Sequence, residues 1–314
     1  MLMPAIAVIA GFGFLAWGAD RFVAGAAGTA RNLGLSPLFI GLTIVGLGTS
    51  APEMLVSVIA ALDGNPGIAV GNALGSNITN SALVLGVAAL IAPLTLRSKT
   101  IKREFPVLLL IIAISWFLLR DGDLMRGNGL VLVAGVLPLL GWMYWIGKRG
   151  EADHDAVAGE LPDLSLPRSL IWLTVGLGVL LVSSRAVVWG AATIAELWGV
   201  SDTVIGLSVI AIGTSLPELA ATVAAAMRDE HDIAVGNVLG SNMFNLLVVL
   251  GLPGLIAPGR VDPEVLIRDF PVMLAITLAV AAMAFMRSGP AQLGRPAGAV
   301  LVVAFVCYQW LLYD

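Results

Sequence analysis

Two short stretches of this chain carry the same set of oxygen-bearing side chains. Residues 46–53 read G-L-G-T-S-A-P-E, and residues 211–218 read A-I-G-T-S-L-P-E, so Glu53 recurs 165 positions later as Glu218. Positions three and four apart share one helix face, so each stretch presents its Thr and Ser hydroxyls with its carboxylate. Both stretches lie within long apolar runs, where a carboxylate is costly unless it binds something. The pattern therefore predicts a ligand site.

A second pair of matching stretches follows the first pair at the same separation. Residues 68–80 read I-A-V-G-N-A-L-G-S-N-I-T-N, and residues 233–245 read I-A-V-G-N-V-L-G-S-N-M-F-N. Each contains a serine and an asparagine four positions apart, on one helix face: Ser76 with Asn80, and Ser241 with Asn245. Gly71 with Gly75, and Gly236 with Gly240, form small-xxx-small patterns that allow helices to approach closely. Two such halves can bring Glu53 and Glu218 together in the middle of the molecule.

The prolines of the first motif supply backbone oxygens. A proline inside a helix lacks the N–H donor and disfavours the helical conformation of the preceding residue. Pro52 and Pro217 are therefore expected to break their helices and free the carbonyls of Gly48 and Gly213. Within a membrane, free carbonyls are tolerated only where they are buried in protein or line a water-filled cavity. Carbonyls, hydroxyls and carboxylates together indicate a cation site.

The available ligand atoms restrict the kind of cation. They are all oxygens, because His154 lies in the central connector, His231 lies in a short loop and Cys307 is the only cysteine. Oxygen ligands suit hard cations and do not favour copper, zinc or iron. Two carboxylates neutralise one calcium ion, and neutral oxygens also suit sodium, whereas magnesium demands a stricter octahedral geometry. Calcium with a monovalent counter-ion is the best match.

The composition places these motifs in a membrane. Hydrophobic residues make up 58% of the 314 residues and charged residues only 12%, whereas soluble domains have about 45–50% and about 25%. A membrane helix needs about 20 apolar residues. Five such runs precede the connector, at roughly 4–30, 37–61, 68–93, 105–120 and 128–147, and five more follow at the same shift. The sequence thus predicts an all-α membrane protein with ten transmembrane helices.

An odd number of spans in each half has a topological consequence. The second half must enter the membrane from the opposite side, which gives two inverted five-helix repeats, a common transporter design. We expect the halves at residues 1–149 and 166–314, joined by a polar, acidic connector at 150–165. Most Lys and Arg residues fall in cytoplasmic loops if both termini lie outside and the connector lies in the cytoplasm.

These repeated motifs resemble the two α-repeats of the cation/calcium exchanger superfamily. The pattern is G-T-S-x-P-E followed by G-N-x-x-G-S-N-x-x-N, present twice with equal spacing. Over essentially its full length the chain is similar to a prokaryotic sodium/calcium exchanger of the bacterial inner-membrane type. This resemblance implies a sodium/calcium antiporter in the inner membrane, without a cofactor, whose partners are the transported ions and the lipid bilayer.

The resemblance also implies roles for individual residues. Glu53 and Glu218 would ligate calcium together with the backbone oxygens of Thr49 and Thr214. Asn80 and Asn245 would lie at the centre, between the two glutamates. Flanking sodium sites would be lined by hydroxyls and two carbonyls, those of Ser50, Ser76, Ser215, Ser241, Gly46 and Ala211.

The same resemblance implies the transport cycle and leaves the coupling ion open. The site would face each side of the membrane in turn as the long first helices of the two halves slide, and excess sodium would make exchange electrogenic. Proton-coupled relatives have an acidic residue inside the second motif, where this chain has Leu74 and Leu239. Some potassium-linked relatives have Asp where this chain has Asn245. Sodium is therefore favoured over proton or potassium coupling.

Other functional classes fit the sequence less well. A passive cation channel shares the oxygen chemistry, but the inverted duplication favours a transporter. An intramembrane hydrolase needs a nucleophile paired with a base, and no apolar run contains His, so we expect no enzyme activity. The charge composition provides no basic surface for nucleic acid, and no obligate protein partner is evident.

Several other polar residues have simpler expected roles. Asn72, Asn77, Asn237 and Asn242 are expected to cap helix starts or to form hydrogen bonds across the repeats. Asp20 is expected to pair with adjacent Arg21 or to lie at the interface. The recurring R-E-F-P and R-D-F-P stretches at 103–106 and 268–271 are expected to start helices at the membrane surface.

Overall fold

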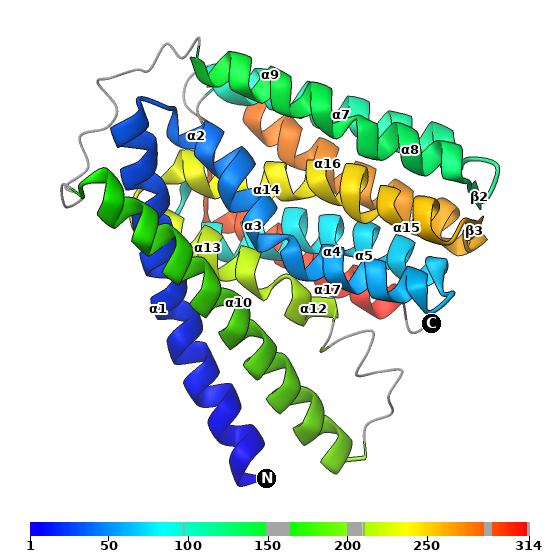
Figure 1. The fold of residues 1–314 in the computed structure, drawn as a ribbon, viewed down its shortest axis with the longest axis horizontal. Helices are drawn as coiled ribbons and strands as arrows, with labels where there is room; N and C mark the ends of the chain where they lie inside the picture. Colours follow the sequence, from blue (N-terminus) through cyan, green and yellow to red (C-terminus); the bar gives the residue numbers. More distant parts are fainter. Residues whose placement is uncertain (97, 149–163, 200–208, 210, 286–290, 313–314) are drawn as a thin grey trace.

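The computed structural model describes residues 1–96, 98–148, 164–199, 209, 211–285 and 291–312. Within these ranges nearly every segment is helical, as the apolar runs predict (Figure 1). The connector predicted at 150–165 falls almost wholly outside the described residues, as does the start of the first motif-bearing run of the second half.

The first half has the following elements in chain order: α1 (Leu2–Leu33), α2 (Pro37–Ile40), the π-helix η1 (Gly41–Val45), α3 (Gly46–Thr49), α4 (Ala51–Leu62), α5 (Pro66–Ile78), the π-helix η2 (Thr79–Val84), α6 (Leu85–Ile91), β1 (Leu94–Leu96), α7 (Ser98–Leu119), β2 (Asp123–Leu124), α8 (Arg126–Ala134) and α9 (Val136–Lys148).

The second half repeats this order with the following elements: α10 (Leu166–Leu197), α12 (Ala211–Thr214), α13 (Leu216–Met227), α14 (His231–Phe244), the π-helix η5 (Asn245–Val249), α15 (Gly251–Ile256), β3 (Gly259–Arg260), the π-helix η6 (Val265–Asp269), α16 (Phe270–Phe285), β4 (Ala291–Leu293) and α17 (Arg295–Leu311).

The described helices have the length and apolar character of a membrane protein. Six helical stretches are long and apolar enough to cross a bilayer, and a seventh is formed if the bent pair of Pro37–Thr49 and Ala51–Leu62 counts as one span. Two shorter apolar helices, Leu216–Met227 and Arg295–Leu311, lie in the second half. The chain is thus an α-helical membrane protein, and its count of ten spans remains a prediction.

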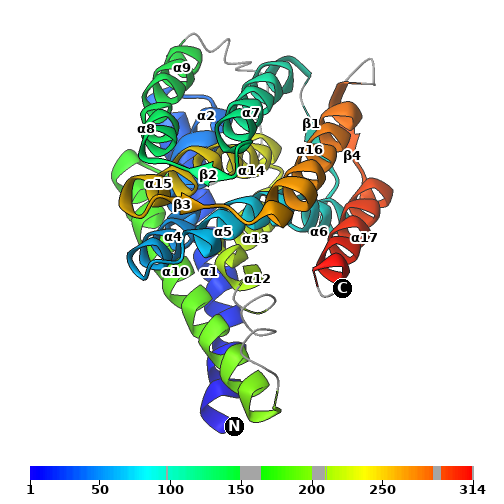
Figure 2. The same cartoon turned by 90° about the vertical axis from the view of Figure 1, so that its right-hand side faces the viewer.

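The long helices α1 and α10 pack against each other and project together from the rest of the molecule (Figures 1 and 2). Small residues recur every seven positions along their contact. A methyl group added at Gly11 would lie 3.3 Å from the carbonyl oxygen of Ser183, and one added at Gly18 would lie 3.2 Å from that of Gly176. Along the contact, the residue numbers therefore increase in α1 while they decrease in α10. The equivalent first helices of the two repeats therefore run antiparallel, as inverted repeats require.

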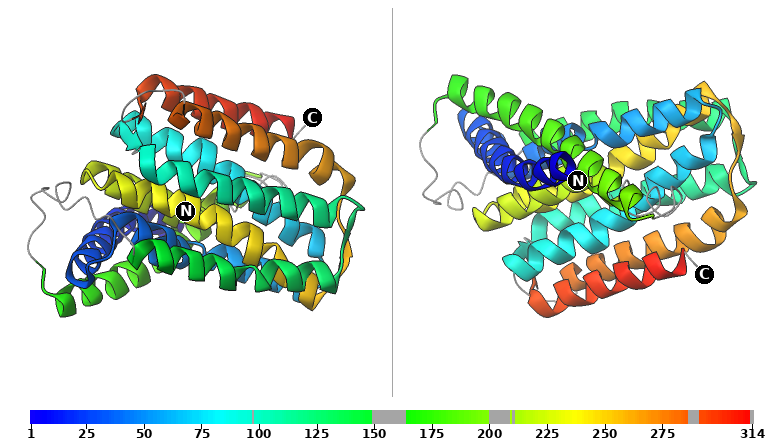
Figure 3. Two further views of the ribbon diagram at one scale, coloured as in Figure 1. Left: turned by 90° about the horizontal axis from the view of Figure 1, so that it is seen from above. Right: turned by 90° about the horizontal axis from the view of Figure 1, so that it is seen from below.

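The helices that carry the second motif form the centre of the molecule (Figure 3). Within His231–Ile256, 94% of an 18-residue apolar segment is buried inside the protein. The corresponding share is 72% within Pro66–Ile91 and 28% within Leu2–Leu33. Glycines allow this close packing, because a methyl group at Gly236 would lie 2.9 Å from the carbonyl oxygen of Leu38. The polar motifs therefore lie in the most enclosed part of the bundle.

Short strand pairs join the two halves in addition to the helices. β1 pairs antiparallel with β4, and β2 pairs antiparallel with β3. The all-helical expectation did not include them. Each pair joins a segment of the first half to one of the second, so that backbone groups left free at helix ends find partners there.

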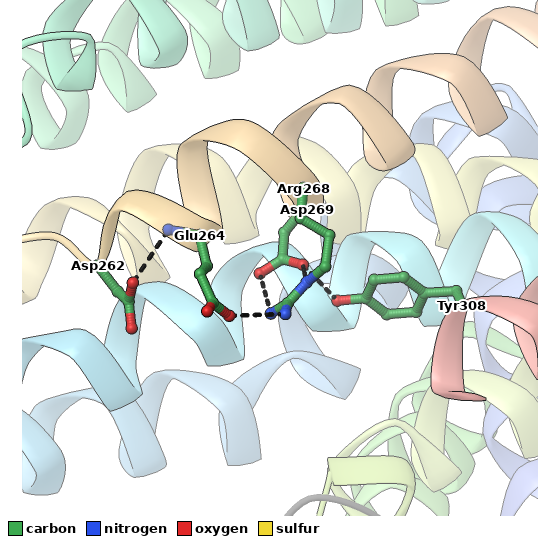
Figure 4. Close-up of polar contacts among 5 residues, drawn as sticks. All are labelled: Asp262, Glu264, Arg268, Asp269 and Tyr308. Carbon is green, nitrogen blue, oxygen red and sulfur yellow. Dashed lines mark hydrogen bonds and ion pairs between the residues drawn. The ribbon is translucent and has the colours of Figure 1, made fainter. Parts of the chain in front are cut away.

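A charged cluster lies where η6 leads into α16 (Figure 4). Arg268 donates from Nε to Asp269 Oδ1 at 2.8 Å and from Nη1 to Glu264 Oε2 at 2.8 Å. Tyr308 on α17 donates its hydroxyl to Asp269 Oδ1 at 3.2 Å. The bond from Tyr308 links residues 268–271 to the last helix.

The R-D-F-P stretch at 268–271 spans the junction of η6 and α16 in a helix that already begins at Pro263, and the R-E-F-P stretch at 103–106 lies inside α7, which begins at Ser98. The prediction that these stretches start helices is therefore wrong, because the residues before them are already helical.

Candidate functional site

The first motif of each half lies at a break between two helices. Ser50 separates α3 from α4 with φ −78° and ψ 5°, and Ser215 separates α12 from α13 with φ −88° and ψ 6°. In the first half the segments meet at 42°. Pro52 and Pro217 lie in the first turn of the new helix, where a missing N–H costs nothing. The predicted interruptions are confirmed, and each places a glutamate in the first turn of a helix.

The two glutamates are linked through the serine of the opposite half. Ser50 donates from Oγ to Glu218 Oε1 at 3.0 Å, and Ser215 donates from Oγ to Glu53 Oε1 at 3.3 Å. Both carboxylates are fully buried. Because each serine lies three positions before the glutamate of its own half, these crossed bonds bring the two carboxylates together. Buried like charges repel, so the pair needs compensating positive charge or protons.

The end of α3 lies against α14 and adds more oxygen atoms. Ser241 donates from Oγ to the Gly46 carbonyl at 3.1 Å, and Thr49 lies 3.4 Å from Ser241 through their hydroxyl oxygens. Thr49 and Thr214 are the last residues of α3 and α12, where helix carbonyls lack intrahelical donors. The structure thus brings Gly46, Thr49 and Ser241 together beside the glutamates.

The remaining predicted ligands lie on elements that pack against the motif helices: η2 contacts α13, η5 contacts α4, and α5 contacts both α4 and α12. Ala211 begins α12, and Ser76 lies buried within α5. Asn80 belongs to the π-helix η2, and Asn245 begins the π-helix η5. Single π-turns of this kind occur frequently at functional sites.

Several buried polar atoms at this centre have no hydrogen-bond partner. They are both amide atoms of Asn80, both amide atoms of Asn245, and Oε2 of Glu53 and of Glu218. Both asparagines are fully buried. An unpaired buried polar group costs about 1–3 kcal/mol, so these six unpaired atoms, which lie on helices that pack against each other, favour a polar ligand. Among the described residues no group of three or more His, Cys, Asp or Glu side chains could hold a metal. A cation here must therefore use hydroxyl, amide and carbonyl oxygens besides the two carboxylates.

Asn72 and Asn237, which were expected to cap helix starts or to bond across the repeats, support the glutamates of their own halves, and Asn237 also forms the expected cross-repeat bond. Asn72 donates from Nδ2 to the Glu53 carbonyl at 3.0 Å and to Ser57 Oγ at 3.0 Å. Asn237 donates in the same way to the Glu218 carbonyl at 3.2 Å and to Thr222 Oγ1 at 2.8 Å. Neither caps a helix start, because both lie inside helices. Asn237 also joins the halves, since its Oδ1 accepts from Thr49 Oγ1 at 3.0 Å.

The other two asparagines do form bonds across the repeats. Asn77 donates from Nδ2 to the Asn242 carbonyl at 3.2 Å, and Asn242 donates from Nδ2 to Ser81 Oγ at 2.8 Å. The cross-repeat alternative is therefore confirmed for this pair.

One of the carbonyls that proline was expected to free has acquired a partner. The Gly213 carbonyl accepts from Ser184 Oγ on α10 at 3.1 Å. The equivalent position on α1 is Ala19, which has no hydroxyl. The two halves thus hold their broken helices differently, and the sequence analysis missed the contribution of Ser184.

Comparison with known proteins identifies the family. The sequence matches the sodium/calcium exchanger protein family over residues 3–144 and 168–313. The chain belongs to this family. It is 41% identical to the inner membrane protein YrbG of Escherichia coli, covering 100% of this chain and 98% of YrbG. It is 31% identical to the sodium/calcium exchanger MaX1 of Methanosarcina acetivorans, covering 98% and 97%.

The fold of this sodium/calcium exchanger family member also matches that of a solved relative. A structure of the sodium-calcium exchanger NCX_Mj aligns with a TM-score of 0.84 at 31% identity, covering 98% of this chain and 97% of the other. The inferred superfamily and the helical membrane fold are therefore confirmed. The chain is a membrane transport protein of the cation/calcium exchange type.

Proposed function

We propose that this protein is a sodium/calcium antiporter that binds its ions between Glu53 and Glu218. The crossed serine bonds to two fully buried carboxylates, with unpaired oxygens beside them, carry this proposal. Calcium is neutralised by two carboxylates and prefers six to eight oxygen ligands. Sodium competes for the same oxygens, so one ion displaces the other.

In the proposed site, calcium and sodium are bound by different sets of residues. Glu53 and Glu218 hold calcium with the carbonyls of Thr49 and Thr214, and Asn80 and Asn245 lie between them. The flanking sodium sites use hydroxyls and carbonyls, namely those of Ser50, Ser76, Ser215, Ser241, Gly46 and Ala211. The hydrogen bond from Ser241 to the Gly46 carbonyl supports this assignment, since it holds two of these oxygens 3.1 Å apart.

The proposed cycle exposes the site to one side of the membrane at a time. Two buried carboxylates without a cation are costly, so the empty protein is reluctant to change conformation and the two ion flows remain coupled. The halves at residues 1–149 and 166–314, joined by the connector at 150–165, rearrange through movement of α1 and α10. These helices contact each other along small residues, which favours sliding over repacking.

We further propose that exchange is electrogenic and takes place in the inner membrane. More than two sodium ions per calcium move net charge, and each such charge is worth about 2.3 kcal/mol per 100 mV. A negative interior then drives calcium extrusion. The similarity to an Escherichia coli protein named for the inner membrane supports this location. The distribution of basic residues supports external termini and a cytoplasmic connector.

Calcium uptake into reconstituted vesicles tests this function. Vesicles loaded with sodium and diluted into sodium-free calcium buffer should accumulate calcium, and an inside-positive potential should increase the rate. Vesicles loaded with potassium at the same ionic strength are the control for coupling. Equal uptake from both preparations would indicate a channel, and uptake driven only by a proton gradient would indicate proton coupling.

A further inference from the structure

An ion pair connects the long helix α1 to the second repeat. Arg228, at the end of α13, donates from Nε to Asp20 Oδ1 at 2.8 Å, and its Nη2 lies 2.6 Å from the same oxygen. Adjacent Arg21, the partner expected from the sequence, lies 4.0 Å from Asp20. Arg21 instead lies against the rings of Trp17 and Trp172, at 5.9 Å and 5.0 Å. Asp20 is therefore held mainly by the opposite repeat.

The inverted repeat relates this pair to a second pair with the charges exchanged. The shift that superposes the motifs carries Asp20 onto Arg185 of α10 and carries Arg228 back onto Asp63 at the end of α4. An acid and a base thus occupy the two equivalent contacts in opposite order.

The second pair is not formed in this structure. Asp63 and Arg185 are both exposed, and among the described residues the ion pairs within 4.0 Å include Asp20 with Arg228 but not Asp63 with Arg185. The helices show the same asymmetry, because α1 packs against α13, whereas α10 has no comparable contact with α4. The repeats thus differ: the first helix of one repeat packs against the motif helix of the other between α1 and α13, with no comparable packing between α10 and α4 among the described residues.

We propose that these four residues form two alternating gate latches: Asp20 with Arg228 in the conformation described, and Asp63 with Arg185 in the opposite conformation. In an inverted-repeat protein, each half adopts the arrangement of the other when access changes sides. The contact of α1 with the end of α13 is then replaced by the contact of α10 with the end of α4. Each latch positions a gate helix and touches no transported ion.

This inference rests on the proposed alternating access, and it predicts opposite effects of two similar substitutions. Asp20→Asn removes the first latch and should shift the population toward the opposite conformation by about 2- to 5-fold, the range expected for a partly exposed ion pair. Asp63→Asn should shift it by a similar factor in the other direction. The double variant should return close to the wild-type distribution. If the substitutions only damaged the structure, the two shifts would not have opposite signs and would not cancel in the double variant.

The conformations can be distinguished by pulsed electron paramagnetic resonance in reconstituted vesicles. Spin labels attached at Leu62→Cys and Val182→Cys, both exposed and close in sequence to the second latch, should come closer when that latch forms. The exposed Cys307 must first be replaced by Ser. Asp121→Asn, in the turn before β2, is the matched control and should leave the distances unchanged. If Asp20→Asn does not fold, the exchange Asp20→Arg with Arg228→Asp replaces it and should retain the wild-type distribution.

The outcomes separate the latches from the function itself. Opposite shifts that cancel in the double variant support the latches. Shifts in the same direction, or none in either variant, would overturn them while sodium-driven calcium uptake by the wild type continued. Absence of that uptake in the wild type would instead overturn the proposed function.

Discussion

Each half supplies a serine to the glutamate of the other, so neither half completes the centre alone. Ser50 bonds Glu218, and Ser215 bonds Glu53. The second carboxylate oxygen of each glutamate has no partner. The serine hydrogen bonds orient both carboxylates, and the second oxygen of each carboxylate stays available to a ligand. In the proposed function, binding of a cation offsets the cost of folding such a centre.

The asparagine supports make a prediction about stability. Asn237→Ala removes the donor to the Glu218 carbonyl and to Thr222, so that each of these buried acceptors loses a hydrogen bond. The free energy of unfolding should fall by about 1–3 kcal/mol. Thermal unfolding in detergent measures the change. Asn32→Ala is the control, because exposed Asn32 also bonds two carbonyls, and there water can replace the lost amide. Equal losses in both variants would refute a special supporting role for Asn237.

The residue pattern predicted the central pair and missed its supports. Glu53 and Glu218 are conspicuous because carboxylates are rare in apolar runs. A hydroxyl side chain follows each glutamate by four positions, Ser57 in the first half and Thr222 in the second. This repeated hydroxyl is the signal that could have identified the supporting residues. The bonds of Asn72 and Asn237 depend on how two helices face each other, which local spacing does not determine. The expected pairing of Asp20 with Arg21 is present at 4.0 Å, but the closer partner Arg228 was not predicted, since it is remote in sequence.

At the scale of elements, the contact of α1 and α10 depends on the absence of side chains. A methyl group added at Gly176 would lie 2.7 Å from Phe22 Cα. The heptad spacing of small residues keeps this seam continuous along both helices. Such contacts let the backbones of the two helices approach closely without interlocking side chains.

Two glycine substitutions on one helix test this seam. Gly176→Ala should lower the free energy of unfolding by about 1–3 kcal/mol, because the added methyl group overpacks the contact. Gly178→Ala has nothing within 4 Å of the added group, so it should be neutral or stabilise the helix by up to about 1 kcal/mol. Unfolding curves of the two variants provide the comparison. A destabilised Gly178→Ala with an unaffected Gly176→Ala would contradict the seam.

The sequence predicted most helices and the positions of their breaks. Proline chemistry placed the interruptions at the two G-T-S-x-P-E motifs, and Ser50 and Ser215 lie at those breaks. The π-helices η2 and η5 were not predicted, because one extra residue in a helical turn leaves the apolar pattern almost unchanged. The paired strands β1 with β4 and β2 with β3 were also missed. Each is only two or three residues long and depends on partners in the other half.

At the scale of the whole molecule, the distribution of basic residues predicts the orientation in the membrane. If both termini lie outside, a cysteine at exposed Met3 in the Cys307→Ser background should react with an impermeant thiol reagent in intact cells. A cysteine at exposed Ser165, beside the connector, should react only after permeabilisation. The reverse pattern of labelling would contradict the proposed orientation and leave the exchange proposal intact.

Calcium uptake by glutamate variants in sodium-loaded vesicles tests the central claim most directly. Glu53→Gln and Glu218→Gln each retain the size of the side chain and remove half of the charge that neutralises calcium, so each should abolish uptake while the protein stays folded. Glu104→Gln is the matched control, since Glu104 is also buried with unpaired oxygens but lies outside the proposed site, and it should transport normally. Near-normal uptake by both Glu53→Gln and Glu218→Gln would contradict the account.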